Sequence, residues 1–117
     1  MKKIIILGAT GFIGRNLTEY YGNKKGYKVF AVYNRRKPWK SKKVNFIKAD
    51  LKIKENVNKV LKNKDIVIQA AATTSGSKDI VSKPYIHVTD NAVINSYALR
   101  SSYENANKFF VFLSCSV

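Results

Sequence analysis

The sequence predicts an α/β fold in which helices cover both faces of a parallel sheet, the doubly wound arrangement. Two observations predict it. Short apolar runs rich in β-branched and aromatic residues alternate with segments of helical periodicity, and a glycine-rich turn joins the first run to the first helix. The 117 residues are enough for one domain with a closed hydrophobic core, and about five parallel strands are expected.

The first three elements form a β-α-β unit. Residues 3–7 are an apolar strand, residues 12–25 carry apolar side chains at helical spacing, and residues 27–33 are again apolar and β-branched. A basic loop over residues 35–43, broken by Pro38, follows the second strand.

The rest of the chain repeats this alternation. Strands are expected at residues 44–47, 65–72 and 108–113, and helices at residues 53–61 and 85–106, with a polar loop over residues 73–82. Strands that alternate with helices in this way are parallel, so the helices must cross over the faces of the sheet.

Composition narrows the class of protein. The 22 lysines and arginines against 7 acidic residues give a net charge of +15, which attracts anions. These basic residues are scattered along the sequence and form no recognised nucleic-acid-binding signature. A phosphate-bearing ligand is therefore favoured over a nucleic acid as the binding partner. A lone cysteine, Cys115, leaves no internal disulfide and no cysteine-based metal site, which suits the cytoplasm. No apolar run reaches the roughly 18–20 residues of a membrane span.

The glycine-rich turn predicts a dinucleotide site. Gly8 allows the tight turn after the first strand, Gly11 lets the backbone approach a pyrophosphate, and Gly14 lets the helix lie close to the strand. The phosphates then meet free N–H groups at the start of the helix. The alternative is that the glycines only turn the chain. The residues expected to face the cofactor from this turn are Gly8, Thr10, Gly11, Phe12, Ile13 and Gly14.

The end of the second strand favours NADP over NAD. An NAD site has an acidic side chain there for the ribose hydroxyls, about twenty residues beyond the glycines. This chain has Asn34, Arg35 and Arg36 and no carboxylate. Guanidinium groups suit a 2′-phosphate through paired, charge-assisted hydrogen bonds. The alternative is that these are ordinary solvated loop charges.

The glycine spacing G-x-x-G-x-x-G and four later motifs resemble the extended short-chain dehydrogenase/reductase family, which includes nucleotide-sugar epimerases, dehydratases and reductases with a Rossmann fold. The resemblance covers essentially the whole chain. The later motifs are Ala49-Asp50-Leu51, residues 67–72, Asn91 and residues 112–117. Within the family, the chain is most similar to the GDP-L-fucose synthase group, although Ser75-Gly76-Ser77 departs from that group's Val-Gly-Gly stretch.

The resemblance implies further cofactor contacts. It implies Asp50 beside the adenine ring, with Leu51 giving a backbone contact or an apolar wall, although an aspartate after a strand also serves as a helix cap. Small residues after the fourth strand would let the cofactor pass, although alanine is also ordinary packing. The remaining implied cofactor contacts are Ala70, Ala71, Ala72 and Asn91.

The resemblance also implies the catalytic groups. Ser114 stands where the family has its catalytic serine or threonine, with Ser116 as the alternative if the register slips. The family's catalytic tyrosine and lysine come after this strand, on the next helix, which would lie beyond Val117. Tyr-x-x-x-Lys also occurs at Tyr20 with Lys24, Tyr21 with Lys25 and Tyr33 with Lys37, but these pairs lie in the first helix and after the second strand, in the wrong part of the fold. We therefore expect an N-terminal piece of a longer, homodimeric enzyme with a nucleotide-sugar substrate. The alternative is a naturally short, regulatory NADP-binding module.

Overall fold

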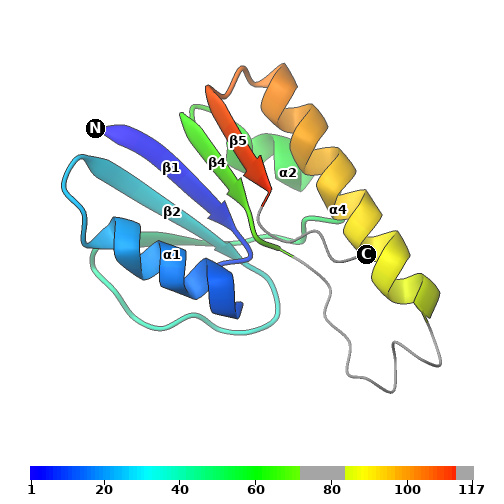
Figure 1. The fold of residues 1–117 in the computed structure, drawn as a ribbon, viewed down its shortest axis with the longest axis horizontal. Coiled ribbons are helices and arrows are strands. Elements are labelled where there is room, and N and C mark those ends of the chain that lie inside the picture. Colours follow the sequence, from blue (N-terminus) through cyan, green and yellow to red (C-terminus); the bar gives the residue numbers. More distant parts are fainter. Residues whose placement is uncertain (72–83, 113–117) are drawn as a thin grey trace.

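The computed structural model describes residues 1–71 and 84–112. Its centre is a five-stranded sheet in the order β3-β2-β1-β4-β5, with every neighbouring pair parallel (Figure 1). The strands are β1 (Lys2–Leu7), β2 (Tyr27–Tyr33), β3 (Val44–Lys48), β4 (Ile66–Gln69) and β5 (Phe109–Phe112). The helices are α1 (Phe12–Gly22), α2 (Lys54–Leu61) and α4 (Pro84–Glu104). The expected five-stranded parallel sheet is confirmed.

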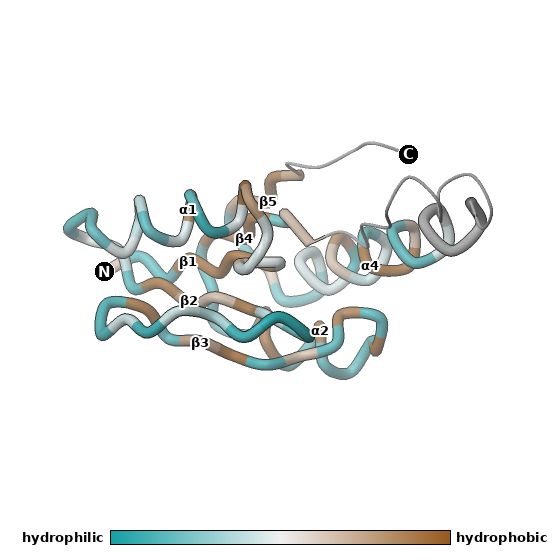
Figure 2. The backbone as a smooth tube through the Cα atoms, turned by 90° about the horizontal axis from the view of Figure 1, so that it is seen from below, coloured by the Kyte–Doolittle hydropathy of each residue, from teal (hydrophilic) through white to brown (hydrophobic). Residues whose placement is uncertain are grey.

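Helices pack on both faces of the sheet, as the sequence predicts. Alternate residues of β1 face opposite ways. Ile4 and Ile6 belong to the cluster packed against Leu17 of α1, whereas Ile5 lies in the larger cluster with Val57 of α2 and residues of α4. The strands carry much of the hydrophobic colour in Figure 2, and β1 is buried completely from Ile4 to Leu7.

Several elements end earlier than their periodicity predicts, each for a local reason. Helix α1 stops at Gly22 and not at residue 25, because Asn23 bonds back to the carbonyl groups of the last turn. Helix α4 stops at Glu104 because Ala106 takes a left-handed φ of 54°. Strand β4 stops at Gln69 and not at residue 72, because the Gln69 side chain itself bonds the backbone of Ala71.

No helix in residues 1–71 or 84–112 is both long enough and apolar enough to cross a membrane.

Candidate functional site

The candidate site lies where the carboxyl ends of the central strands meet. The strand order changes direction at β1, since β2 lies on one side of it and β4 on the other. In open α/β sheets, ligands bind at such a switch point, outside the carboxyl ends of the strands. The loop from Gly8 to Gly11 leaves β1 at this point and leads into α1 (Figure 1).

Packing within the protein explains two of the three glycines. Gly8 has a φ of +80°, and a Cβ there would lie 2.6 Å from the backbone nitrogen of Ala71. A Cβ on Gly14 would lie 2.8 Å from the carbonyl carbon of Gly8, because α1 starts directly against the loop. Both positions therefore need glycine for the fold alone.

Packing does not explain the third glycine. Gly11 has a φ of −75° and a ψ of 169°, an extended conformation that any residue adopts. A Cβ there would meet only the carbonyl oxygen of Gly8, at an ordinary 3.6 Å, and the residue is exposed. The missing side chain keeps open a space beside the loop backbone. This fits the close approach of a pyrophosphate, which is the role that the glycine pattern predicts for Gly11.

The first turn of α1 offers hydrogen-bond donors at the same place. The first N–H groups of a helix have no partner within it, and the N-cap residue Gly11 has no side chain to supply one. The first N–H that closes the helix belongs to Arg15, which donates to the Gly11 carbonyl at 2.8 Å. Phe12 is 86% exposed and Ile13 is 44% exposed, so the first turn of α1 faces solvent. Such a helix start favours an anion.

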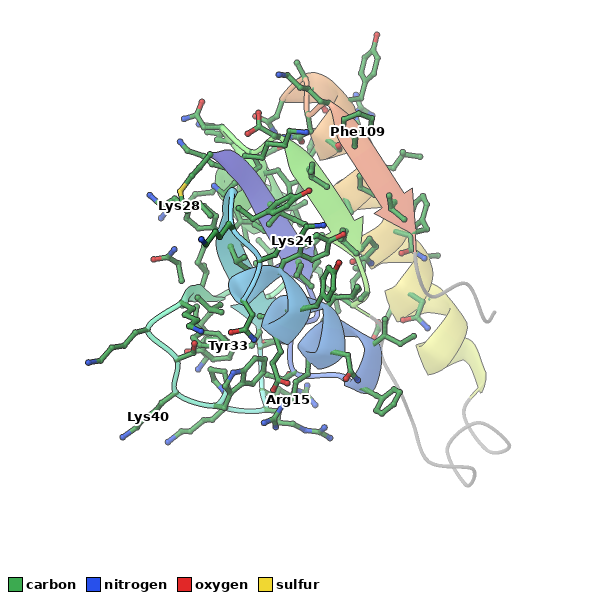
Figure 3. The ribbon with its side chains drawn as sticks, turned by 60° about the vertical axis from the view of Figure 1, so that its left-hand side comes forward. Arg15, Lys24, Lys28, Tyr33, Lys40 and Phe109 are labelled. Carbon is green, nitrogen blue, oxygen red and sulfur yellow. The ribbon has the colours of Figure 1, made fainter. Side chains whose placement is uncertain are left out.

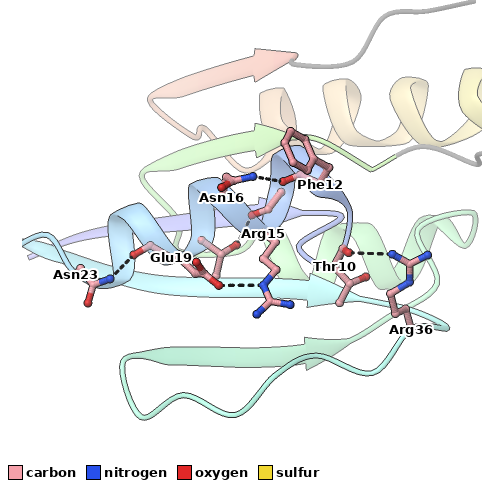
Figure 4. A network of polar contacts seen from close by, with 9 residues as sticks. Thr10, Phe12, Arg15, Asn16, Glu19, Asn23 and Arg36 are labelled. Atoms are coloured by element: carbon pink, nitrogen blue, oxygen red, sulfur yellow. Dashed lines mark hydrogen bonds and ion pairs between the residues drawn. The ribbon is translucent and has the colours of Figure 1, made fainter.

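The basic residues after β2 reach this loop. Arg36 donates from Nη1 to the carbonyl oxygen of Thr10 at 3.5 Å, a long bond that joins two segments 26 residues apart (Figure 4). Asn34 and Arg35 are exposed beside it. Arg36, one of the residues expected to receive a 2′-phosphate, therefore lies beside the glycine loop.

Asp50 does not cap α2, whose N-cap residue is Ile53. Its carboxylate accepts the N–H of Lys52 at 3.0 Å, and its carbonyl accepts the N–H of Ile53 at 3.2 Å, so it holds a turn before the helix. The preceding Ala49 donates its N–H to the carbonyl of Tyr33 at 2.9 Å, which places this turn beside the end of β2. Leu51 is buried in the core. Their contacts with adenine remain a prediction.

A buried glutamine that sequence reasoning did not single out fixes the end of β4. Gln69 is 1% exposed, and its amide both donates to the carbonyl of Ala71, at 3.0 Å, and accepts the Ala71 N–H, at 3.2 Å. It also donates to Oδ1 of Asn95 on α4 at 2.9 Å. Ala71 is the residue packed against Gly8, so Gln69 helps to place the glycine loop. A polar residue ending an otherwise apolar strand was the available signal.

Of the other residues expected at the site, two lie in the described part of the chain and three lie outside it. Ala70 follows β4 and donates its N–H to the carbonyl of Leu7 at 2.9 Å, beside the glycine loop. Asn91 is a partly buried residue of α4. Ala72, Ser114 and Ser116 lie outside the described residues.

The edge of the sheet where the strands begin, opposite the glycine loop, has a tyrosine–lysine pair and an open hollow. Tyr20 and Lys24 lie on the last turn of α1 and just beyond it, away from the glycine loop, and a side-chain hydrogen bond to Tyr20 raises the pKa of Lys24. An open hollow of about 830 Å³, lined by Tyr27, Asp65 and Phe109 among others, also lies at the amino ends of the strands. Both features are at the edge opposite to the one that binds ligands in this fold class.

Comparison with known proteins gives a family and a set of similar folds. The model of the NAD dependent epimerase/dehydratase family matches residues 4–117. No curated protein sequence matches the chain.

Among solved structures, the chain is similar to the enzyme WbmH of Bordetella bronchiseptica in complex with NAD+. The two are 25% identical, with a TM-score of 0.78 over 94% of this chain and 38% of WbmH. It is also similar to the epimerase Mth375 of Methanothermobacter thermautotrophicus, at 22% identity and a TM-score of 0.81 over 95% of this chain and 34% of that one. A UDP-glucose 4-epimerase gives 21% identity and a TM-score of 0.79 over 95% and 35%. The chain thus spans little more than a third of these enzymes.

Proposed function

The chain belongs to the NAD dependent epimerase/dehydratase family, and on that basis we propose that it forms the NADP-binding part of an enzyme acting on a nucleotide sugar. The observation that carries the proposal is Gly11. The fold has no need of glycine at this position, whereas a pyrophosphate lying against the loop does.

The residues around the loop fit the parts of the cofactor. The N–H groups of Phe12 and Ile13 would hold the pyrophosphate at the start of α1, where the helix dipole favours negative charge. Asp50 would receive the adenine end, since its turn lies beside the end of β2. Ala70 and Ala71 would leave room for the ribose and nicotinamide beside Gly8. The bound nicotinamide supplies the hydride chemistry of the family.

The preference for NADP rests on Arg35 and Arg36. A 2′-phosphate adds about two negative charges, which two guanidinium groups bind through charge-assisted hydrogen bonds. The contact of Arg36 with Thr10 already directs this side chain toward the glycine loop. No carboxylate occurs among residues 34–36 to repel the phosphate. The net charge of +15 also favours a ligand with additional negative charge.

The reaction itself is proposed from the family resemblance. Ser114 would hydrogen-bond the reacting oxygen of the sugar, with Ser116 as the alternative, in a cytoplasmic and homodimeric enzyme of the GDP-L-fucose synthase type. Hydride transfer also needs a proton donor, which the family's tyrosine supplies. A regulatory module that binds NADP without turnover would share the cofactor site and lack this step.

Cofactor titration tests the proposal. The protein should bind NADPH more tightly than NADH, and the double variant Arg35→Ala/Arg36→Ala should lose about 1–3 kcal/mol of binding free energy for NADPH only. Lys24→Ala/Lys25→Ala removes the same charge from exposed positions beyond the far end of α1 and serves as the matched control. A native preference for NADH, or an equal loss in the control, would contradict the assignment of the two arginines.

A further inference from the structure

The segment after β2 is the most basic stretch of the chain. Residues 35–43, here called the basic loop, hold two arginines and four lysines and no acidic residue. The loop has no helix or strand of its own. Its like charges repel one another, so contacts with the rest of the protein must determine where Arg35 and Arg36 lie.

Trp39 supplies the largest of these contacts. Its indole ring contacts two side chains of other elements, Arg15 of α1 and Phe46 of β3. The Arg15 guanidinium carbon is 4.6 Å from the indole centroid, and the Phe46 ring packs edge to face at 5.1 Å and 81°. Trp39 is partly buried in this stack, whereas its neighbour Lys40 is exposed and projects from the loop (Figure 3).

The two other attachments are single hydrogen bonds on the surface. Arg36 reaches Thr10 near the start of the loop at 3.5 Å, and Lys43 reaches Oδ1 of Asn23 at its end at 2.7 Å. Exposed bonds of charged side chains contribute little, because water competes for both partners. The Trp39 stack lies between them in sequence, and among the contacts that the loop makes with residues 1–71 and 84–112 it is the one that partly buries an aromatic ring.

We propose that Trp39 is a positioning residue for NADP selectivity, because its stacking contacts with Arg15 and Phe46 hold the basic loop where Arg35 and Arg36 can receive a 2′-phosphate. The inference rests on the proposed function, since it explains how the two arginines are held ready for that ligand. A loop fixed before binding spares the cofactor the entropic cost of ordering it. The benefit applies to NADP and not to NAD, which has no group for these arginines.

The test compares Trp39→Ala with Trp39→Phe and Lys40→Ala. The alanine variant should bind NADP+ about 5- to 50-fold more weakly, the range expected from losing one cation–π and one aromatic contact. Its affinity for NAD+ should stay within about twofold, because the pyrophosphate site is untouched. Trp39→Phe keeps a ring and should recover most of the loss. Lys40→Ala removes a neighbouring exposed charge and should change NADP+ binding by less than about threefold.

Two measurements report on the loop without relying on a measured cofactor affinity. Trypsin should cut Trp39→Ala within the basic loop much faster than the wild type, while thermal unfolding shows that the rest of the domain is intact. Trp39 is the only tryptophan of the chain, so acrylamide quenching of wild-type fluorescence reports its shielding directly. The quenching constant should be low in the free protein and should not fall further with NADP+.

The outcomes separate the inference from the proposed function. Equal binding of NADP+ and NAD+ by the wild type would contradict the proposed cofactor, while trypsin and quenching would still decide whether Trp39 holds the loop. Unchanged NADP+ preference in Trp39→Ala, or a Trp39 that becomes shielded only when NADP+ binds, would overturn the positioning role. An equal loss for both cofactors in a folded variant would also overturn it.

Discussion

Replacing Gly11 with valine separates the needs of the fold from the needs of a bound dinucleotide. A Cβ at Gly11 meets only the carbonyl oxygen of Gly8, at 3.6 Å, and the backbone is already extended. The same change at Gly14 drives the new side chain into the backbone, to 2.8 Å from Gly8 and 3.0 Å from Ala9. We therefore expect Gly11→Val to fold and Gly14→Val not to fold.

The two effects of Gly11→Val differ in size. Valine is a poor N-cap residue, so we expect the free energy of unfolding to fall by about 1 kcal/mol. In the complex, the valine side chain would hold the pyrophosphate away from the N–H groups of Phe12 and Ile13. Each charge-assisted hydrogen bond contributes about 1.5–3 kcal/mol, so losing both weakens binding by about 3 kcal/mol or more, at least about 100-fold.

The assay pairs thermal unfolding by circular dichroism with titration of NADPH fluorescence, for wild type, Gly11→Val and Gly14→Val. The expected pattern is a folded Gly11→Val that binds no cofactor at concentrations that saturate the wild type. Undiminished affinity in this variant would show that the loop is only a turn. An unfolded Gly11→Val would show that the geometry of the N-cap has been misjudged.

Two further predictions concern catalysis and stability. In a longer protein that includes the family's tyrosine and lysine, Ser114→Ala should lower turnover by about 100-fold or more with little change in cofactor affinity. If Ser114→Ala leaves turnover unchanged and Ser116→Ala lowers it, the predicted register of the fifth strand is wrong by two residues. If the longer protein has no turnover at all, the regulatory module is favoured. Burial, and then the charges of Lys3 and Lys28, lower the pKa of Lys64 from its ordinary 10.5. The unfolded chain then binds more protons in the interval between the lowered pKa and 10.5, so the stability of the wild type relative to Lys64→Met should rise with pH through that interval. Urea unfolding of both proteins at about pH 7 and about pH 10 measures this, and a difference that stays constant or falls would refute the sign.

The sequence predicts the elements of the fold well, because each apolar run is local and long enough to show its periodicity. All five strands overlap their predicted ranges, and β2 coincides with its range at both ends. The errors lie at the ends of elements, where one side chain decides. Asn23 ends α1 and Gln69 ends β4 through bonds that hydrophobic periodicity does not encode.

The site is predictable to the extent that it follows the glycine spacing. The spacing predicts a turn at Gly8, close helix packing at Gly14 and a cofactor role for Gly11, and the geometry agrees, since a Cβ would clash with backbone at Gly8 and Gly14 but not at Gly11. The stack of Arg15 on Trp39 joins residues 24 positions apart, and no local pattern in the sequence connects them. Contacts of this kind depend on how the sheet brings distant segments together.

The most direct test of the dinucleotide site is to locate the cofactor by NMR. Titrating isotope-labelled protein with NADP+ should shift the amide signals of Gly11, Phe12 and Ile13 most strongly, followed by those of the basic loop. Amides around the hollow at the opposite edge of the sheet, such as those of Tyr27 and Asp65, should not move. Shifts confined to that opposite edge, with the glycine loop unaffected, would contradict the site described here.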